Sequence, residues 1–440
     1  MPGEDARRST TNQLRTCTKY LPSFTVVALT LVKACRENNP APQVLLVCHK
    51  NLRNRKGLSK FVRNWKENWK HMTNRLPLNM LLAGLVLVIF AGLTFAQEAQ
   101  YQDIIDAKPM FKTLPNHLEL APSTVGAAGT TALTLWNGSF IDLTKRKVTY
   151  TMVGTNPAQS NVSTTIPVYI IPIKMVYGSH TFDPLTAKAS NGLSVIKNII
   201  ASPIFKRGVN FTQGSTNLGT TQYIDAFQRG NFWEYVHTHT SYHVLLGTPT
   251  VLPEQTIKVA SALGSVMNNP FGSGIVGTYD ILSFDSKLQT IRKNFTQIHP
   301  GVLPLFITYD IYLTQGGCCI GGYHSANGIQ PGGQTYAYAT YVGSPGAFSQ
   351  NVSAISHEIG EWMDDPFVNN KVHCTDNNVL EVGDPLENRS NYGAFPYTLN
   401  GFTYDLQSLM FIGYFGAPRA TSVHSWLAFQ NDESSVCPGQ

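Results

Sequence analysis

Hydrophobic and polar residues alternate over short distances through most of the chain after about residue 125. The apolar runs are rich in β-branched and aromatic residues and are separated by Gly, Pro, Asn and Ser, which is typical of strands. We expect strands at residues 147–153, 167–177, 303–313 and 334–342. A Gly-rich loop, GGCCIGGYHSANG, separates the last two, and a short helix is expected at residues 191–201, stopped by Pro203.

One segment has helical spacing instead. Between Gly346 and Pro366 the pattern predicts a helix over residues 349–364. Its apolar positions fall on one side and should pack on the core: Val352, Ile355, Ile359, Trp362 and Met363. His357 and Glu361, four residues apart, fall together on the opposite side, with Asp364 near them. We therefore predict an α+β fold in which this helix packs on a mostly antiparallel sheet.

The longest apolar run lies near the N-terminus. Residues 76–97 carry no charge, residues 80–96 are almost entirely apolar, Arg75 precedes them, and small residues stand at Thr94 and Ala96. These features are typical of a secretory signal, with Met72 as its start, so residues 1–71 are expected to be an upstream basic leader that the mature protein lacks. The alternative is a single-pass membrane anchor over residues 72–96. Under both interpretations the remainder is exported: a linker at residues 97–125 and a domain at residues 126–440.

The charge is unevenly distributed. The chain of 440 residues has a formal net charge of +6, but residues 1–75 hold 15 Lys/Arg and 4 Asp/Glu, whereas the remaining 365 residues hold 18 and 23. The body is therefore mildly acidic, which argues against a nucleic-acid partner. Contact with a membrane is expected only through the N-terminal apolar segment.

Four cysteines lie in the region expected to be exported: Cys318, Cys319, Cys374 and Cys437. In an oxidising compartment we expect disulfides, with three possible pairings. We expect Cys318 and Cys319 each to bond a distant partner rather than one another.

The helix carries the sequence His357-Glu358-Ile359-Gly360-Glu361. It resembles the HExxH helix of zinc metallopeptidases, with Glu361 in place of the second histidine. In the gluzincin branch a downstream glutamate completes the zinc site, and Glu381-Val382-Gly383-Asp384 follows at a suitable distance. The resemblance implies zinc ligands at His357, Glu361 and Glu381, a general base at Glu358, and Asp384 as the residue that orients His357. The region also resembles uncharacterised secreted HExxE proteins and, distantly, the plant EXORDIUM (phosphate-induced) family, which has a similar Cys-containing Gly-rich loop with a histidine.

The charge of the segment supports a cation site independently. Residues 358–387 hold eight acidic residues and a single Lys or Arg, Lys371. Such a cluster repels itself unless it is solvated or binds a cation. Zinc is favoured by the histidine, and calcium at Asp364, Asp365 and Asp376 is the alternative. The other interpretation is a solvated helix face on which His357 bonds Glu361.

Zinc with three protein ligands leaves room for a water whose proton Glu358 would accept, and His324 or Tyr323 from the Gly-rich loop would stabilise the oxyanion. The leading hypothesis is a secreted zinc-dependent metallopeptidase-like hydrolase acting on a peptide or protein. The alternative is a non-catalytic extracellular or cell-wall-associated binding protein with a structural cation. Three further histidines, His237, His239 and His243, form a weaker candidate metal site on an extended segment.

Overall fold

The computed structural model describes residues 107–117, 132–328, 332–373, 375, 378–430 and 433–437, together with two short strands near the N-terminus. The chain divides into two units, Met1–Gln97 and Glu98–Gln440. In the first, β1 (Leu29–Leu31) pairs antiparallel with β2 (Val44–Leu46). The rest of the expected leader and the whole apolar segment at residues 72–96 lie outside the described residues. Among the helices that are described, none is long and apolar enough to cross a membrane.

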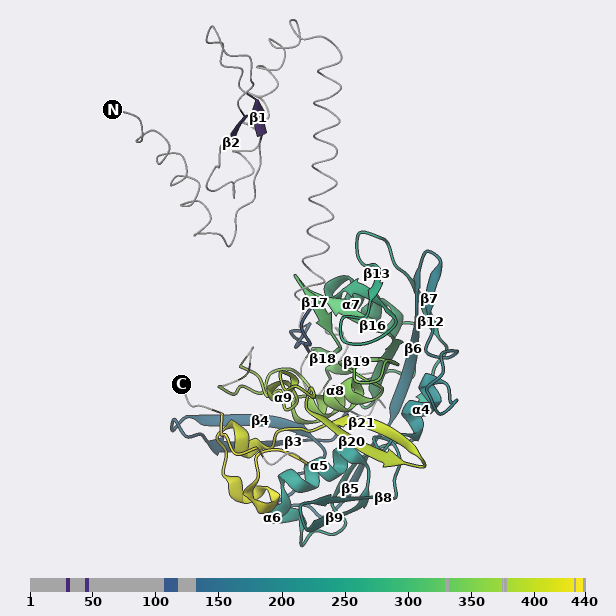
Figure 1. The fold of residues 1–440 in the computed structure, drawn as a ribbon. Helices are drawn as coiled ribbons and strands as arrows, with labels where there is room; N and C mark the ends of the chain where they lie inside the picture. Colours follow the sequence, from purple (N-terminus) through teal and green to yellow (C-terminus); the bar gives the residue numbers. More distant parts are fainter. Residues whose placement is uncertain are drawn as a thin grey trace, which may run out of the picture. The chain divides into compact units, whose positions relative to one another are not determined.

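A mixed sheet forms the centre of the second unit (Figure 1). Its order is β11 (Thr250–Val251), β6 (Val168–Tyr177), β15 (Leu303–Tyr309), β19 (Gln334–Tyr341) and β18 (Gly322–Asn327). The first four strands pair in parallel, and β18 is antiparallel to β19. The strands β7 (His180–Phe182) and β12 (Gln255–Lys258) also pair with β6. At the middle of the sheet, β15 and β19 are buried on both faces almost throughout, as parallel strands usually are.

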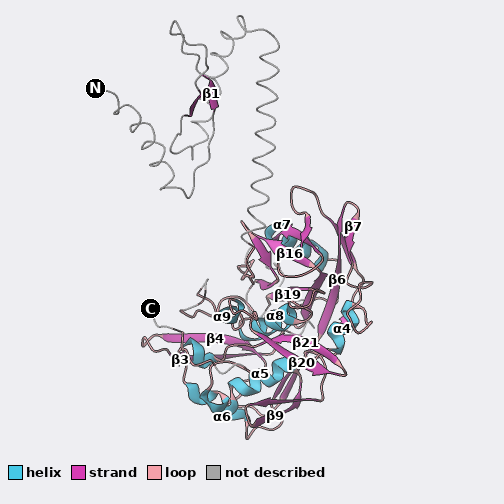
Figure 2. Ribbon diagram, viewed as in Figure 1, coloured by secondary structure: helices cyan, strands magenta, loops and turns pink. Residues whose placement is uncertain are grey.

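Smaller sheets and hairpins surround this sheet, and helices make up the minority of the elements (Figure 2). One sheet has the order β13 (Val266–Asn268), β14 (Ile275–Asp280), β16 (Ile311–Thr314) and β17 (Cys318–Ile320). The two-stranded pairs are β3 (Leu135–Ile141) with β4 (Lys147–Val153), β8 (Val209–Gln213) with β9 (Thr216–Thr221), β20 (Ala394–Leu399) with β21 (Phe402–Gln407), and β5 (Ser163–Ile166) with β10 (His243–Leu246). Two helices lie on the central sheet and are described below. The other described helices are α4 (Val195–Ala201), α5 (Tyr223–Asn231), α6 (Trp233–Val236) and α9 (Asp384–Glu387), with three short 3-10 turns at Ile412–Phe415, Arg419–Thr421 and Val423–Ser425.

Two helices cover opposite faces of the central sheet. The two helices are α7 (Ile281–Arg292) and α8 (Ser353–Asp364), and alternate residues of β19 face one or the other. Tyr336 and Tyr338 pack in the apolar cluster that contains α7, whereas Ala337 and Ala339 pack in the cluster that contains α8. The period-2 alternation of a strand explains this division. The small alanines leave room for α8 to lie close to the sheet.

The helix α8 is buried on every side. It contacts β18 and β19, the strand β21, and β4 (Figure 1). All of its residues are buried, including Glu358 and Glu361. The helix begins at residue 353 rather than 349 because Ser349 and Asn351 have positive φ values of 61° and 38°. The expectation of a solvated helix face is therefore wrong, since the face that carries the acids is covered by other elements.

The expected mixture of α and β structure is confirmed, and antiparallel pairs are the majority among the described strands. The sheet under α8 is nevertheless parallel at its centre. The strand expected at residues 147–153 has these bounds as β4, while that expected at 303–313 is divided into β15 and β16 by Asp310, whose φ is 52°. The Gly-rich loop contains the strands β17 and β18.

Residues 107–117 belong to the interval that was expected to be a linker, residues 97–125, but they are held on the domain. This segment runs beside β17 and β18: Lys108 and Met110 donate backbone hydrogen bonds to the carbonyls of Cys318 and Cys319 at 2.8 and 3.0 Å. The side chains of Phe111 and Leu114 are buried. Backbone pairing and apolar burial hold the segment on the domain, which the composition of the interval did not indicate.

The expected cysteine pairing is also wrong. Cys318 and Cys319 form a disulfide with each other, and the peptide bond between them is cis, with Cα atoms 3.1 Å apart. Cys437 is disulfide-bonded as well, and Cys374 lies outside the described residues.

Candidate metal centre

Three elements bring histidines and carboxylates together in the interior. The helix α8 supplies His357, Glu358 and Glu361, and β18 supplies His324. The segment leading into α9 supplies Glu381 and Asp384. The site is thus built from three stretches of sequence that the fold brings next to one another.

The first group, the His324 cluster, consists of His324, Glu358, Glu361 and Glu381. The Nδ1 atom of His324 lies 3.6 Å from Glu358 Oε2, 3.7 Å from Glu361 Oε2 and 4.0 Å from Glu381 Oε2. The other ring nitrogen, Nε2, donates to the carbonyl oxygen of Asp365 at 3.0 Å. A neutral His324 therefore directs the lone pair of Nδ1 towards three carboxylates.

The second group, the His357 cluster, consists of His357, Glu361 and Asp384. The Nε2 atom of His357 lies 3.1 Å from Glu361 Oε1 and 3.3 Å from Asp384 Oδ1. Its Nδ1 atom bonds the side-chain oxygen of Gln407. The amide nitrogen of Gln407 donates to the carbonyl of Tyr392 at 3.0 Å, so its oxygen faces the imidazole as an acceptor. Nδ1 therefore carries the proton, and Nε2 is left for the carboxylates.

The two clusters share Glu361. Its Oε2 atom faces His324 and its Oε1 atom faces His357. The backbone N–H groups of Gly383 and Asp384 donate to Oε1 at 3.0 and 3.3 Å, which fixes the orientation of the carboxylate.

Several ligand-type atoms of the two clusters make no hydrogen bond to any described residue. They are His324 Nδ1, His357 Nε2, both oxygens of Glu358, Glu381 Oε1 and Asp384 Oδ1. The residues are buried except for Asp384, whose side chain is 20% exposed. In the described part of the chain, none of the four acids forms an ion pair with a lysine or arginine. Buried polar atoms are normally satisfied, so this concentration of unsatisfied acceptors is a group that could hold a cation.

The electrostatics agree with this interpretation. Burial, reinforced by neighbouring carboxylates, raises the pKa of Glu358, Glu361 and Glu381 well above the usual range. Burial lowers the pKa of His324 to about 4, which keeps the ring neutral. Burial also acts to lower the pKa of His357, but Asp384 and Glu358 outweigh it and raise that pKa. A proton on Nε2 and a divalent cation are therefore alternative occupants of the position between His357 and its carboxylates.

The spacing suits a metal ion. Ligand atoms about 2.1 Å from a tetrahedral zinc stand roughly 3.4 Å apart. The separations of 3.1 to 4.0 Å measured above lie on both sides of that value. Among the described residues, the triplets His324–Glu358–Glu361 and His357–Glu361–Asp384 each place their ligand atoms within 4.8 Å of one another.

The structure changes several expected roles. Gln407, not Asp384, bonds the far nitrogen of His357, and Asp384 stands on the ligand side of the ring. His324 faces the carboxylates instead of extending from an exposed loop, because β18 is a buried strand. Glu381 lies beside His324 rather than His357. Tyr323 points to the opposite face of the sheet, where its hydroxyl donates to Asp285 at 3.0 Å.

Sequence patterns did not indicate two contacts of the site. Gln407 lies at the end of β21 in no recognisable motif. Phe111 stacks on His357 with ring centroids 3.5 Å apart, and its N–H donates to Glu387 at 2.8 Å. Both come from segments distant in sequence, and only the packing of the fold brings them to α8.

The alternative calcium site is not assembled by the described residues. Asp364 Oδ1 accepts from Gln228, and Asp365 accepts from the N–H groups of Asn369 and Asn370 at 2.9 and 3.1 Å. Asp376 lies outside the described residues.

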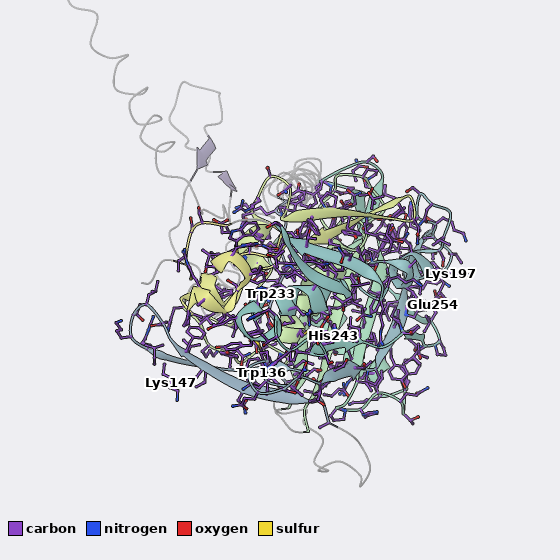
Figure 3. The ribbon with its side chains drawn as sticks, turned by 90° about the horizontal axis from the view of Figure 1, so that it is seen from below. Trp136, Lys147, Lys197, Trp233, His243 and Glu254 are labelled. Carbon is purple, nitrogen blue, oxygen red and sulfur yellow. A yellow bond between two sulfur atoms is a disulfide. The ribbon has the colours of Figure 1, made fainter. Side chains whose placement is uncertain are left out.

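The three further histidines are not gathered around one point either. His237 Nδ1 bonds the carbonyl of Trp233, His239 bonds that of Pro157, and His243, labelled in Figure 3, pairs with Asp225 at 2.7 Å. Each imidazole has a separate partner because this segment turns after α6 instead of running extended.

Comparison of the chain with protein-family models, curated proteins and solved structures gave no match. The resemblance to metallopeptidases therefore depends on the motif of α8 and on the arrangement of its neighbours.

Proposed function

We propose that this protein is a secreted, metal-dependent hydrolase of the metallopeptidase type, acting on a peptide or protein, with zinc as the preferred ion. The observation that carries the proposal is the pair of buried imidazoles, each anchored through one nitrogen to a neutral acceptor and facing carboxylates through the other. Two such histidines in one interior cluster are the donor set that zinc prefers.

His357, Glu361 and Asp384 would hold the ion of the proposed reaction. Asp384 takes the place expected of Glu381, because it is the carboxylate near His357 Nε2. A bound zinc ion lowers the pKa of a coordinated water and polarises a carbonyl.

Glu358 has the role of general base. It follows His357 on α8, its Oε2 atom lies 3.6 Å from His324 Nδ1, and neither of its carboxylate oxygens makes a hydrogen bond to a described residue. A carboxylate without hydrogen bonds can accept a proton from water and return it to the leaving amine. Burial raises the pKa of Glu358, which makes its carboxylate a stronger base.

Metal removal gives the first prediction. Purified protein should contain a divalent cation, and chelation should lower its melting temperature because the buried acids lose their counter-charge. Binding at 1,000 times the dissociation constant stabilises a fold by about 4 kcal/mol. Elemental analysis and thermal unfolding with and without EDTA, followed by zinc repletion, measure this. Protein without bound metal whose unfolding is unchanged by zinc would contradict the proposal.

The second prediction concerns the substitution Glu358→Gln. It should lower kcat for a cleaved peptide by about 10² to 10⁴ while leaving the metal content unchanged, because the amide cannot take up the proton. Glu234→Gln, at an exposed position on α6, is the matched control and should keep full activity. Cleavage of a peptide library, with kcat and KM measured for the best substrate, tests the prediction. Equal rates for both variants would exclude Glu358 as the base.

A second function is favoured by the burial of the site. Phe111 covers the face of His357, and His324, His357 and Glu358 are fully buried. This closure supports a non-catalytic extracellular binding protein in which the cation stabilises the fold. Bound metal together with no cleavage by the wild-type protein would favour this candidate over the hydrolase.

A further inference from the structure

We infer that the site holds two divalent cations bridged by Glu361. This inference rests on the proposed metal site and extends it from one ion to two. The first ion is the one between His357, Glu361 and Asp384; the second would lie between His324, Glu361 and Glu381.

The two oxygens of Glu361 face different histidines. Oε1 lies 3.1 Å from His357 Nε2, and Oε2 lies 3.7 Å from His324 Nδ1. A carboxylate that presents one oxygen to each of two imidazole lone pairs has the arrangement of a bridging ligand. Two-metal hydrolytic sites hold their ions about 3.5–4 Å apart, a separation that one carboxylate spans.

The second position has its own donors. His324 and Glu381 are not ligands of the first ion, and in the described chain neither pairs with a lysine or arginine. His324 Nδ1 makes no hydrogen bond to a described residue and lies 4.0 Å from Glu381 Oε2. The orientation of His324 is fixed by its bond to the Asp365 carbonyl, as that of His357 is fixed by Gln407. Each imidazole thus has its own orienting partner, as a histidine that ligates a metal requires.

The charges balance for two ions. Ionised Glu358, Glu361, Glu381 and Asp384 carry four negative charges, and both histidines are neutral as ligands. A single divalent ion would leave two uncompensated carboxylates in an interior where no lysine or arginine of the described chain pairs with them. Two divalent ions neutralise the four acids.

The test is the number of ions bound and their coupling. The full chain loaded with Mn²⁺ should bind two ions, and their electron paramagnetic resonance spectrum should show the magnetic exchange of a bridged pair. Zinc analysis should likewise give two ions per chain in the wild type and in the exposed control Glu234→Gln. Glu381→Gln and Asp384→Asn should each retain one ion, whereas Glu361→Gln should weaken both.

The outcomes separate the two proposals. One ion per chain, or two Mn²⁺ ions without exchange coupling, overturns the bridged pair and leaves the single-ion hydrolase in place. No ion in the wild type overturns both. Because the spectrum is recorded on the wild-type protein, the inference is tested even when a variant does not fold.

Discussion

Replacing Trp362 with alanine should destabilise the protein by about 3–5 kcal/mol, the range found for removing a large aromatic side chain from a packed core. Trp362 is completely buried on α8. Its indole Nε1 donates to the Thr335 hydroxyl on β19 at 2.8 Å, so one side chain ties the helix to the central sheet. Equilibrium unfolding in urea, monitored by circular dichroism, measures the change.

Trp362→Phe is the matched control. It keeps most of the ring volume and loses the hydrogen bond, leaving the Thr335 hydroxyl without its donor, so the cost should be about 1–3 kcal/mol. The alanine variant should also bind metal more weakly, because Glu361 is the preceding residue. A loss below 1 kcal/mol for Trp362→Ala would show that α8 is held in place by its other contacts.

The strands were predictable where local composition determines them. The run KVTYTMV becomes β4 with the expected bounds, since its branched and aromatic residues suit a half-buried strand. The apolar run at 303–313 was read as one strand because Asp310 does not interrupt its hydrophobicity. Its positive φ, and the bond from the Gly343 N–H to its side chain at 2.8 Å, depend on a neighbouring loop that composition does not reveal.

The site was predictable only in part for a similar reason. Helical spacing alone brings His357 beside Glu361, and that pair is found at 3.1 Å. The role of His324 depends on β18 lying against α8, and the role of Gln407 depends on β21 passing the same helix. Such long-range contacts leave no periodic signal in the sequence. A solvated polar face of α8 therefore stayed open as the alternative to a metal site, although other strands and residues 107–117 cover that face.

The Gly383→Ala substitution should disrupt the metal centre without removing a ligand. A Cβ atom at Gly383 would lie 2.2 Å from His357 Nδ1 and 2.5 Å from Cε1, far inside contact distance. The φ of Gly383 is −99°, which alanine adopts readily, so the clash with the imidazole is the cause of the expected effect. Displacing the ring breaks its bond to Gln407, and loss of such an orienting contact typically lowers metal affinity 10- to 100-fold.

Competition with a chelating dye measures the affinity, and thermal unfolding of the metal-free protein measures the separate cost of overpacking, about 1–3 kcal/mol. Gly332→Ala is the matched control, since no atom of the described residues beyond its chain neighbours lies within 4 Å of a Cβ placed there. If Gly383→Ala binds metal as tightly as Gly332→Ala, the imidazole of His357 does not need its present orientation to hold an ion. If affinity falls by more than the measured overpacking cost explains, His357 belongs to the metal centre and its ring orientation is set by Gly383 and Gln407.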